Sequence, residues 1–252
     1  MTRRWLAVLA LAVVGAGGVA LLVRHNAAAP VVRSATATTT TPTERPRLAL
    51  LTSLPLVFGE TFALDSPRSA ALDRLDQAYR VDPIGVADAA SLAGHRLLLM
   101  AHPRAQPAEV LVELDAWVRG GGRVVLLADP RLDWHSERPL GDRLRPPPDF
   151  ADTGLLKRWG LTLDGPVADG PRVEHGGGYD IMTVSPGALS SASTACVVEA
   201  GRLVAHCRIG RGAVTVIADA DFLNVSGEGA IDGPTEHNLD LLVSELSRRQ
   251  SR

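Results

Sequence analysis

The stretch Asp115–Pro130, "DAWVRGGGRVVLLADP", holds three consecutive glycines between two apolar segments of different period. Apolar residues before the glycines recur at helical spacing, and the run after them is continuously apolar, which predicts a helix followed by a buried strand. Phosphate-binding glycines have the opposite order, because they follow a strand and meet the amide end of a helix. Gly120–Gly122 instead meet the carbonyl end, where the helix dipole repels an anion. We therefore predict that they end the helix in a left-handed cap and bind no phosphate.

Strands and helices alternate along the chain before this stretch. Apolar runs predict strands at Leu48–Leu51, Arg96–Ala101 and Arg123–Ala128, and residues 79–85 read as a further short strand. Apolar residues at helical spacing predict helices over residues 65–80 and 107–119. Strands that are apolar on both faces and alternate with helices are typical of a mostly parallel sheet covered on both sides. The fold class is therefore α/β.

The second half departs from this alternation. Asp129–Phe150 is a long loop rich in proline and charge, which is uncommon in a compact domain unless the loop has a function. A short helix over residues 152–160 and a short strand follow. Residues 195–209 read as an antiparallel hairpin, and Ala213–Ala218 as another buried strand. In the closing helix, over residues 235–249, four side chains are expected to face the core: Leu239, Leu242, Val243 and Leu246.

The predicted hairpin brings two cysteines together. If Gly201-Arg202 forms a two-residue type II′ turn, with glycine at its first central position, Cys196 lies directly opposite Cys207. Opposed residues lie about 4.5–5.5 Å apart at Cα, within the range of about 4.4–6.8 Å that a disulfide spans. A domain outside the cytoplasm meets an oxidising compartment, so we predict a Cys196–Cys207 disulfide. Two buried free thiols are the alternative.

The N-terminal segment predicts a membrane anchor over residues 1–23. Trp5–Val23 is an uncharged run preceded by two arginines, and at about 1.5 Å per residue it spans a hydrocarbon core of about 30 Å. It exceeds the roughly 7–15 apolar residues of a cleavable signal peptide, which is the alternative. Residues 24–46, rich in Ala, Thr and Pro, read as a linker, and residues 47–252 as the folded domain. We expect a single-pass protein of the inner (cytoplasmic) membrane with its domain on the periplasmic, extracytoplasmic side.

The charge and aromatic content argue against a nucleic-acid partner. The 26 basic and 28 acidic residues give a net charge of −2, without a basic block that would track a phosphate backbone. Aromatic residues make up only 4% of the chain, which argues against stacking platforms for bases.

Sequence patterns for nucleophilic catalysis are missing. Neither cysteine follows a strand at a tight turn, and no G-x-S-x-G motif occurs. Ser53, Ser136 and Ser185 fall in predicted loops, where capping of a turn is the ordinary role of serine.

Four polar residues, His102, Asp129, Asp219 and Asp221, each follow a predicted strand. The carboxyl ends of parallel strands meet at one edge of the sheet, where ligands usually bind. Asp219 and Asp221 share a face in an extended chain, so a divalent cation is conceivable. The favoured alternative is that the aspartates cap turns by accepting backbone N–H groups, so we expect no metal and no cofactor.

Tryptophan and histidine in the long loop complete the set of candidate contact residues. Trp134 and His135 are candidates for contact with a ligand or partner because they lie in the polar loop. Trp117 and Trp159 fall on predicted helix faces, so they are expected in the core.

Several segments, taken in order, resemble a known family. They are "LLTSLPLVFGE" (50–60), "LDAWVRGGGRVVLLADP" (114–130), "LLKRWGLTL" (155–163), "GAVTVIADADFLN" (212–224) and "HNLDLL" (237–242). Together they resemble the GldG-like domain of uncharacterised ABC-type transport systems, which is related to the intraflagellar transport protein 52 domain and to flavodoxin-like and glutamine-amidotransferase-like α/β folds. The resemblance covers Arg47–Leu246. An amidotransferase would carry a nucleophile after a central strand, whereas Val124–Ala128 here runs into Asp129-Pro130.

The resemblance and the residues together predict a non-catalytic, membrane-anchored accessory domain of an ABC-type transport or envelope system. The resemblance implies ABC permease and ATPase subunits as partners, besides the membrane through residues 5–23. The alternative is an envelope hydrolase that uses the aspartates at the strand ends, with or without a metal. A third option is a sugar- or small-molecule-binding module that uses the same edge of the sheet.

Overall fold

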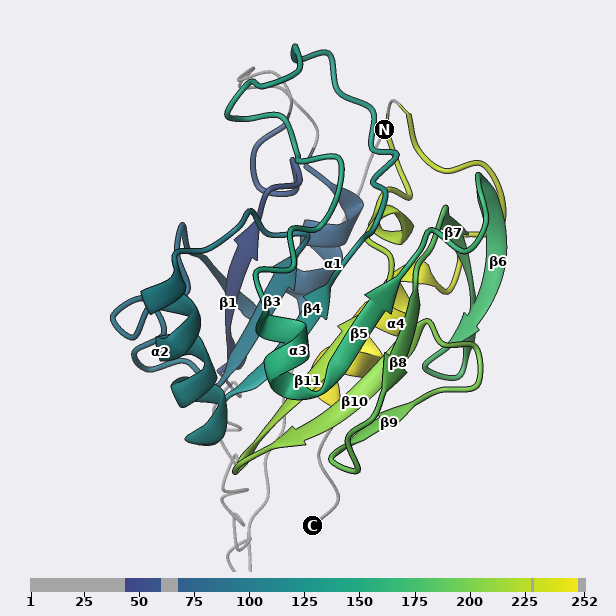
Figure 1. Ribbon diagram of the computed structural model, residues 1–252. Coiled ribbons are helices and arrows are strands. Elements are labelled where there is room, and N and C mark those ends of the chain that lie inside the picture. The colour runs from purple at the N-terminus through teal and green to yellow at the C-terminus, as the bar shows by residue number, and fades with distance from the viewer. Residues whose placement is uncertain (1–43, 60–67, 228, 249–252) are drawn as a thin grey trace, which may run out of the picture. The chain divides into compact units, whose positions relative to one another are not determined.

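A seven-stranded sheet forms the centre of the folded part, in the order β2-β1-β3-β4-β11-β10-β9 (Figure 1). The computed structural model describes residues 44–59, 68–227 and 229–248. The first five strands in this order run parallel to one another. β10 runs antiparallel to β11, and β9 runs antiparallel to β10. The strands are β1 (Arg47–Thr52), β2 (Arg80–Pro83), β3 (Leu97–Ala101), β4 (Arg123–Leu127), β11 (Gly212–Ile217), β10 (Val204–Ile209) and β9 (Cys196–Val198). The predicted α/β class, with a mostly parallel sheet and an antiparallel hairpin in the second half, is confirmed.

The order of the parallel strands creates a reversal point between β1 and β3. The chain moves from β1 outward to β2, then crosses back over β1 to β3 and continues through β4 to β11. The connections that leave β1 and β3 therefore diverge to opposite sides. In open α/β sheets such a divergence opens a crevice at the carboxyl ends of the strands, where ligands bind.

Four α-helices cover the two faces of the sheet. α1 (Ala70–Ala78) and α4 (Asn238–Ser247) lie on one face, and α2 (Ala108–Arg119) and α3 (Leu155–Trp159) on the other (Figure 1). An ion pair of 3.2 Å between Arg74 and Asp240 joins α1 to α4. On the opposite face the buried carboxylate of Asp115 in α2 accepts hydrogen bonds from Arg158 at 3.0 Å and Trp159 at 3.1 Å. The sheet is thereby shielded on both sides, as its continuously apolar strands require.

The three glycines end α2 as the sequence predicts. Gly121 has φ of +116°, and its N–H donates to the carbonyl of Val118 at 2.9 Å. The N–H of Gly122 donates to the carbonyl of Trp117 at 3.1 Å. These two bonds form a Schellman motif, which satisfies carbonyls that the helix end leaves without intrahelical donors.

The inward face of α4 differs from the prediction. Asn238, Leu241, Leu242, Glu245 and Leu246 are buried, whereas Leu239 and Val243 are only half-buried. The pattern of apolar residues misplaced this face because two polar residues lie inside it. The Asn238 amide is satisfied there, since it accepts the N–H of Met182 at 2.9 Å and donates to the carbonyl of Phe222 at 2.8 Å.

Two small antiparallel sheets follow the long loop, and only one of their four strands was predicted. β5 (Leu161–Asp164) pairs with β8 (Ala188–Ser191), and β6 (Pro171–Gly176) pairs with β7 (Tyr179–Val184). A short 3-10 helix, η1 (Asp221–Leu223), follows β11. Gly177 and Gly178, both at positive φ, connect β6 to β7. This Gly-Gly pair is the signal from which the β6–β7 hairpin was predictable.

The structure bonds Cys196 in β9 to Cys207 in β10. The turn between the two strands differs from the predicted one, because Glu199 pairs with Val204 and the loop is four residues long. The positive φ belongs to Arg202, at +60°, and not to Gly201. Adding one residue on each side of a hairpin loop leaves the register unchanged, so the two cysteines still lie opposite each other.

The predicted membrane span lies outside the described residues, as does most of the predicted linker. Within the described ranges, no helix combines the length and the apolar character that crossing a bilayer requires.

Replacing Gly121 with alanine should destabilise the fold by about 1–2 kcal/mol, because alanine disfavours positive φ. An added Cβ at Gly121 meets only an Arg96 side-chain nitrogen at 3.8 Å, so the cost is conformational and not steric. Gly85→Ala is the matched control, since its Cβ would meet no atom within 4 Å and its φ is not positive. Urea unfolding should place this control within about 0.5 kcal/mol of the wild type. Equal effects of the two substitutions would contradict the left-handed cap.

The Cys196→Ala/Cys207→Ala double variant should lose about 2–4 kcal/mol of unfolding free energy, because the disulfide no longer restricts the unfolded chain. Urea unfolding of the oxidised protein and the variant measures this difference. Thiol counting on exported protein that is denatured without a reductant supplies the control. A count of two free thiols would rule the bond out.

Candidate functional site

Three buried carboxylates meet at the carboxyl edge of the sheet. Asp129 follows β4, and Asp219 and Asp221 follow β11, its neighbour in the sheet. One carboxylate oxygen from each lies within 4.8 Å of the others, and the three residues are 0%, 0% and 2% exposed. The convergence expected from the strand order is therefore present for these three residues.

Backbone N–H groups from the turn after β4, the turn after β11 and the end of β7 donate to these carboxylates. Asp129 accepts the N–H of Ala220 at 2.7 Å and that of Arg131 at 2.9 Å. Asp219 accepts the N–H of Phe222 at 2.8 Å and that of Val184 at 3.2 Å. Asp221 accepts the N–H of Asp133 at 2.9 Å. The aspartates thus cap the turns around them and tie the start of the long loop to β7 and η1.

Burial and mutual repulsion raise the pKa values of all three aspartates. Burial, opposed by the backbone donors, raises the pKa of Asp129 to about 6. Burial and the nearby Asp129 carboxylate raise the pKa of Asp221 to about 8. The pKa of Asp219 also rises well above its usual value, through burial first and then the charges of Asp129 and Asp221. At neutral pH the cluster therefore holds protons that exposed aspartates would have lost.

His102 contacts the long loop and makes no described hydrogen bond to the three aspartates. It is fully buried after β3, with φ of +46°. Its Nε2 lies 3.0 Å from the carbonyl oxygen of Pro147, so this nitrogen carries the proton and donates it. Burial lowers the pKa of the imidazole, and Nδ1 has no hydrogen-bond partner within the described part of the chain. The residue therefore anchors the loop as a neutral side chain.

The long loop closes on itself over the carboxyl edge. At its base, the N–H of Phe150 donates to the carbonyl of Asp129 at 2.7 Å, and that of Leu132 donates to Pro148 at 2.8 Å. Loops longer than about 12–15 residues without secondary structure are uncommon in compact domains and, where they are ordered, are usually functional. Of the candidates in this loop, Trp134 is half-buried and His135 is half-exposed, its Nε2 2.8 Å from a Glu137 carboxylate oxygen. Trp134 lines a pocket of about 340 Å³.

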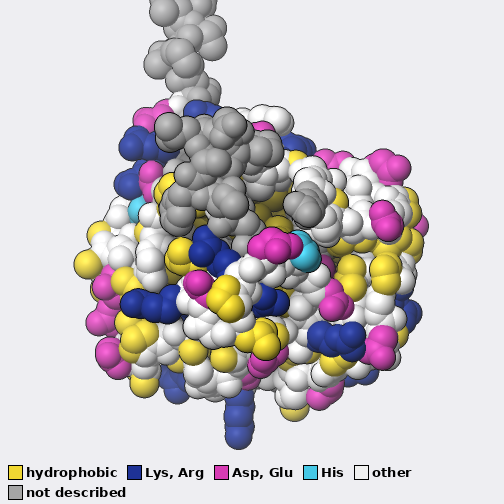
Figure 2. Space-filling view, turned by 90° about the horizontal axis from the view of Figure 1, so that it is seen from above, with side chains coloured by type: hydrophobic (Ala, Val, Ile, Leu, Met, Phe, Trp, Pro, Cys, Tyr) yellow, Lys and Arg dark blue, Asp and Glu magenta, His cyan; other side chains and the backbone are white. Residues whose placement is uncertain are grey.

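A second pocket of about 280 Å³ lies over the carboxyl ends of β1 and β2. Arg138 and Arg143 reach it from the long loop, and Arg104 reaches it from the turn after β3. Arg104 and Arg143 also line the first pocket, so they lie between the two. Figure 2 looks down on this edge and shows Lys and Arg side chains beside hydrophobic ones. Sequence reasoning missed these arginines, although "ERPLGDRLR" (137–145) carries two of them, Arg138 and Arg143, in a loop already suspected of a function.

A separate group of titratable side chains connects α4 to the hairpin. Buried Glu245 lies 2.9 Å from Nε2 of His206 and accepts hydrogen bonds from Arg248 at 2.8 and 3.0 Å. Although burial raises the pKa of Glu245, the bonds from His206 and Arg248 hold it below its usual value. Because the guanidinium engages both carboxylate oxygens, this group is a charge-balanced contact that fixes α4 to β10.

Asp221→Asn should become more stable relative to the wild type as pH rises. A carboxyl whose folded pKa exceeds its unfolded pKa stabilises the fold at low pH and loses that contribution as pH rises toward the folded value. The variant does not titrate, so between pH 5.5 and 8.5 the difference should shift in its favour by about 1–3 kcal/mol. Chemical unfolding at a series of pH values measures it.

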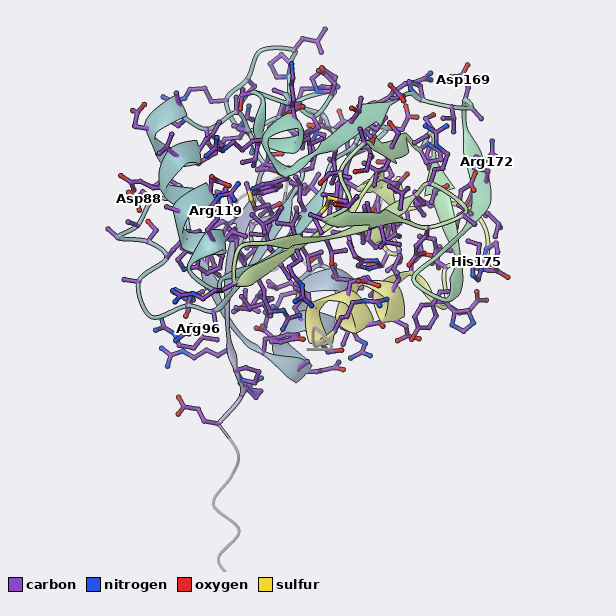
Figure 3. The ribbon with its side chains drawn as sticks, turned by 60° about the horizontal axis from the view of Figure 1, so that its bottom comes forward. Asp88, Arg96, Arg119, Asp169, Arg172 and His175 are labelled. Carbon is purple, nitrogen blue, oxygen red and sulfur yellow. A yellow bond between two sulfur atoms is a disulfide. The ribbon has the colours of Figure 1, made fainter. Side chains whose placement is uncertain are left out.

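The control for this measurement is Asp169→Asn, at a side chain that is 79% exposed and labelled in Figure 3. It should follow the pH dependence of the wild type. A constant difference between Asp221→Asn and the wild type across this pH range would show that Asp221 is ionised throughout.

Comparisons with known proteins add a weak likeness of fold. No family model matches the chain, and no curated protein matches its sequence. The mmIFT52 N-terminal domain matches with a TM-score of 0.49 and 14% identity over 81% of this chain and 99% of that one. Cytoplasmic protein STM1381 from Salmonella typhimurium LT2 matches with a TM-score of 0.47 and 12% identity over 79% and 98%. Exo-beta-1,4-mannosidase Op5Man5 from Opitutaceae bacterium strain TAV5 has a TM-score of 0.43 and 14% identity over 72% of this chain, which spans only 33% of that protein.

Proposed function

We propose that this protein is a non-catalytic, membrane-tethered accessory domain of the GldG-like kind, which binds a partner protein or ligand for an ABC-type transport or envelope system. The resemblance of its segments to that family and the apolar run Trp5–Val23 support the tether and the partner. In this proposal the domain lies on the extracytoplasmic side of the membrane, an assignment consistent with the Cys196–Cys207 disulfide.

The observation that carries the non-catalytic role is the way the strand-end aspartates are used. Their oxygens hold backbone N–H groups of the neighbouring turns, as in a structural cap. At the end of the central strand β4, where a nucleophile would be positioned in an amidotransferase-like fold, the chain continues as Ala128-Asp129-Pro130. The carboxyl edge instead carries the closed long loop, whose side chains are suited to contact and not to bond cleavage.

A hydrolase that uses Asp129, Asp219 and Asp221, with or without a metal, is the second candidate. Their convergence within 4.8 Å favours it, since a carboxylate oxygen that accepts one N–H still has a second lone pair for a cation. Metal analysis of the purified protein and turnover on envelope substrates, each compared with Asp219→Asn, separate the two candidates. Bound metal or turnover that this substitution abolishes would replace the accessory role.

The accessory role is tested by capturing the tagged full-length protein from crosslinked native membranes and quantifying permease and ATPase subunits. Leu140 in the long loop is 86% exposed, and Val112 in α2 is 70% exposed. Leu140→Asp should reduce the co-purified subunits at least fivefold, because a charge then replaces an apolar contact. Val112→Asp, an equivalent change on another element, should not. Absence of these subunits from the wild-type capture, or equal loss with both variants, would contradict the proposal.

A further inference from the structure

We propose that the pocket at the reversal point of the sheet binds a small organic anion, a carboxylate or phosphate monoester that carries an apolar group. In this arrangement the arginines Arg104 and Arg143 hold the charged group, and the apolar walls hold the remainder. The inference refines the proposed binding role by naming the chemistry of a ligand, and it rests on that role.

The position of the pocket is that of a ligand site in an open α/β sheet. Its floor includes Thr52 and Ser53 at the end of β1, and Pro83 and Ile84 at the end of β2. Arg104 closes it from the turn after β3. The pocket therefore covers the carboxyl ends of β1 and β2 and borders the turn after β3, beside the reversal point where the connections diverge.

The charge of the pocket is positive. Three arginines line it, and none of its lining residues, all within the described ranges, is acidic. Arg138 pairs with Asp142 at 3.9 Å, so we assign the charged group of the ligand to Arg104 and Arg143. An anion that enters the pocket can accept charge-assisted hydrogen bonds from a guanidinium group of this kind.

Neutral acceptors hold two of the loop's guanidinium contacts in place. Arg104 donates to the backbone carbonyl of Arg145. Arg145 in turn donates to the carbonyls of Ser136, at 3.1 Å, and Arg138. A carbonyl orients a guanidinium without cancelling its charge, whereas a carboxylate would cancel it. A carbonyl of the loop thus orients Arg104 at the edge of the pocket before any ligand binds, which reduces the ordering that binding requires.

The walls of the pocket point to an apolar part of the ligand. Leu54, Val57, Phe58, Ile84 and Leu144 line it, and Phe58 and Leu144 are 67% and 53% exposed. Inorganic phosphate alone would leave these side chains in water, whereas an aryl or short alkyl group would cover them. The volume of about 280 Å³ lies at the small end of small-molecule pockets, roughly 300–1,000 Å³, so the ligand is compact.

Isothermal titration calorimetry on the full-length protein tests the proposal with four probes. Phenyl phosphate and phenylacetate represent the two anion chemistries, inorganic phosphate lacks the apolar part, and benzyl alcohol lacks the charge. At least one of the two aryl anions should bind tenfold more tightly than both inorganic phosphate and benzyl alcohol, and the stronger of them identifies the anion.

Three variants locate the binding site. Arg143→Gln, at an exposed side chain, should weaken the aryl anion at least tenfold. Arg96→Gln removes the same charge at an exposed residue next to the amino end of β3, labelled in Figure 3, and should change the affinity less than twofold. Leu144→Ser should weaken the aryl anion at least threefold and leave the affinity for inorganic phosphate unchanged. Unchanged thermal unfolding of the variants excludes loss of folding as the cause.

Several results would overturn the proposal. They are no heat of binding for either aryl anion at millimolar concentration, equal affinity for inorganic phosphate, or equal losses in Arg143→Gln and Arg96→Gln. Failure here is distinguishable from failure of the proposed function, because capture of transporter subunits is measured separately. A protein that recovers those subunits but binds no aryl anion retains the accessory role and loses only the ligand assignment.

Discussion

The buried carboxylate of Asp129 holds together the edge of the sheet on which every candidate contact lies. One of its oxygens accepts the N–H of Ala220 at 2.7 Å, which joins the turn after β4 to the turn after β11. Its other oxygen accepts the N–H of Arg131 and so sets the direction in which the long loop departs. The carbonyl of the same residue accepts the N–H of Phe150, so the loop also returns there. A buried carboxylate without donors is too costly to persist, and this constraint fixes both turns.

The clustering of three buried carboxylates has an electrostatic cost. Perturbed pKa values at a sheet edge are a common sign of catalysis, because active sites tune proton affinity in this way. Here burial and mutual repulsion raise the pKa values, and hydrogen bonds from backbone amides oppose the rise. The carboxylates repel one another while they organise the loop, so the stability of this edge depends on their protonation. Raised pKa values alone therefore do not distinguish a structural cluster from a catalytic one. The hydrogen-bond partners of the carboxylates make that distinction.

The long loop converts this rigid edge into a surface with a defined charge. Carbonyl oxygens of the loop orient Arg145 within it and Arg104 from the turn after β3, and residues of the loop line two adjoining pockets. Neutral His102 anchors the loop by donating a hydrogen bond to the carbonyl of Pro147. A scaffold that holds a loop this firmly needs little reordering to bind, which suits a recognition module.

The sequence by itself determined the local order of elements. Continuous apolar runs specified strands β1, β3, β4 and β11, because strands covered on both faces are largely apolar. Gly120–Gly122 specified the end of α2, because only glycine adopts positive φ without cost. The cysteine register was also correct, although the turn was wrong, because a symmetric change in loop length preserves pairing. The hairpin β6–β7 was missed although its Gly-Gly signal was present.

Only the tertiary structure decided which side chains meet. Position after a strand predicted that Asp129, Asp219 and Asp221 converge, but the same argument placed His102 with them, and its ring instead contacts the loop. The buried face of α4 contains Asn238 and Glu245, whose partners come from β7 and η1 and from β10, so no periodicity within the helix reveals them. The arginine-lined pocket likewise needs the turn after β3 and a loop that follows β4 to lie over β1 and β2. Local patterns record what each segment buries, whereas polar contacts depend on which distant segment satisfies each donor and acceptor.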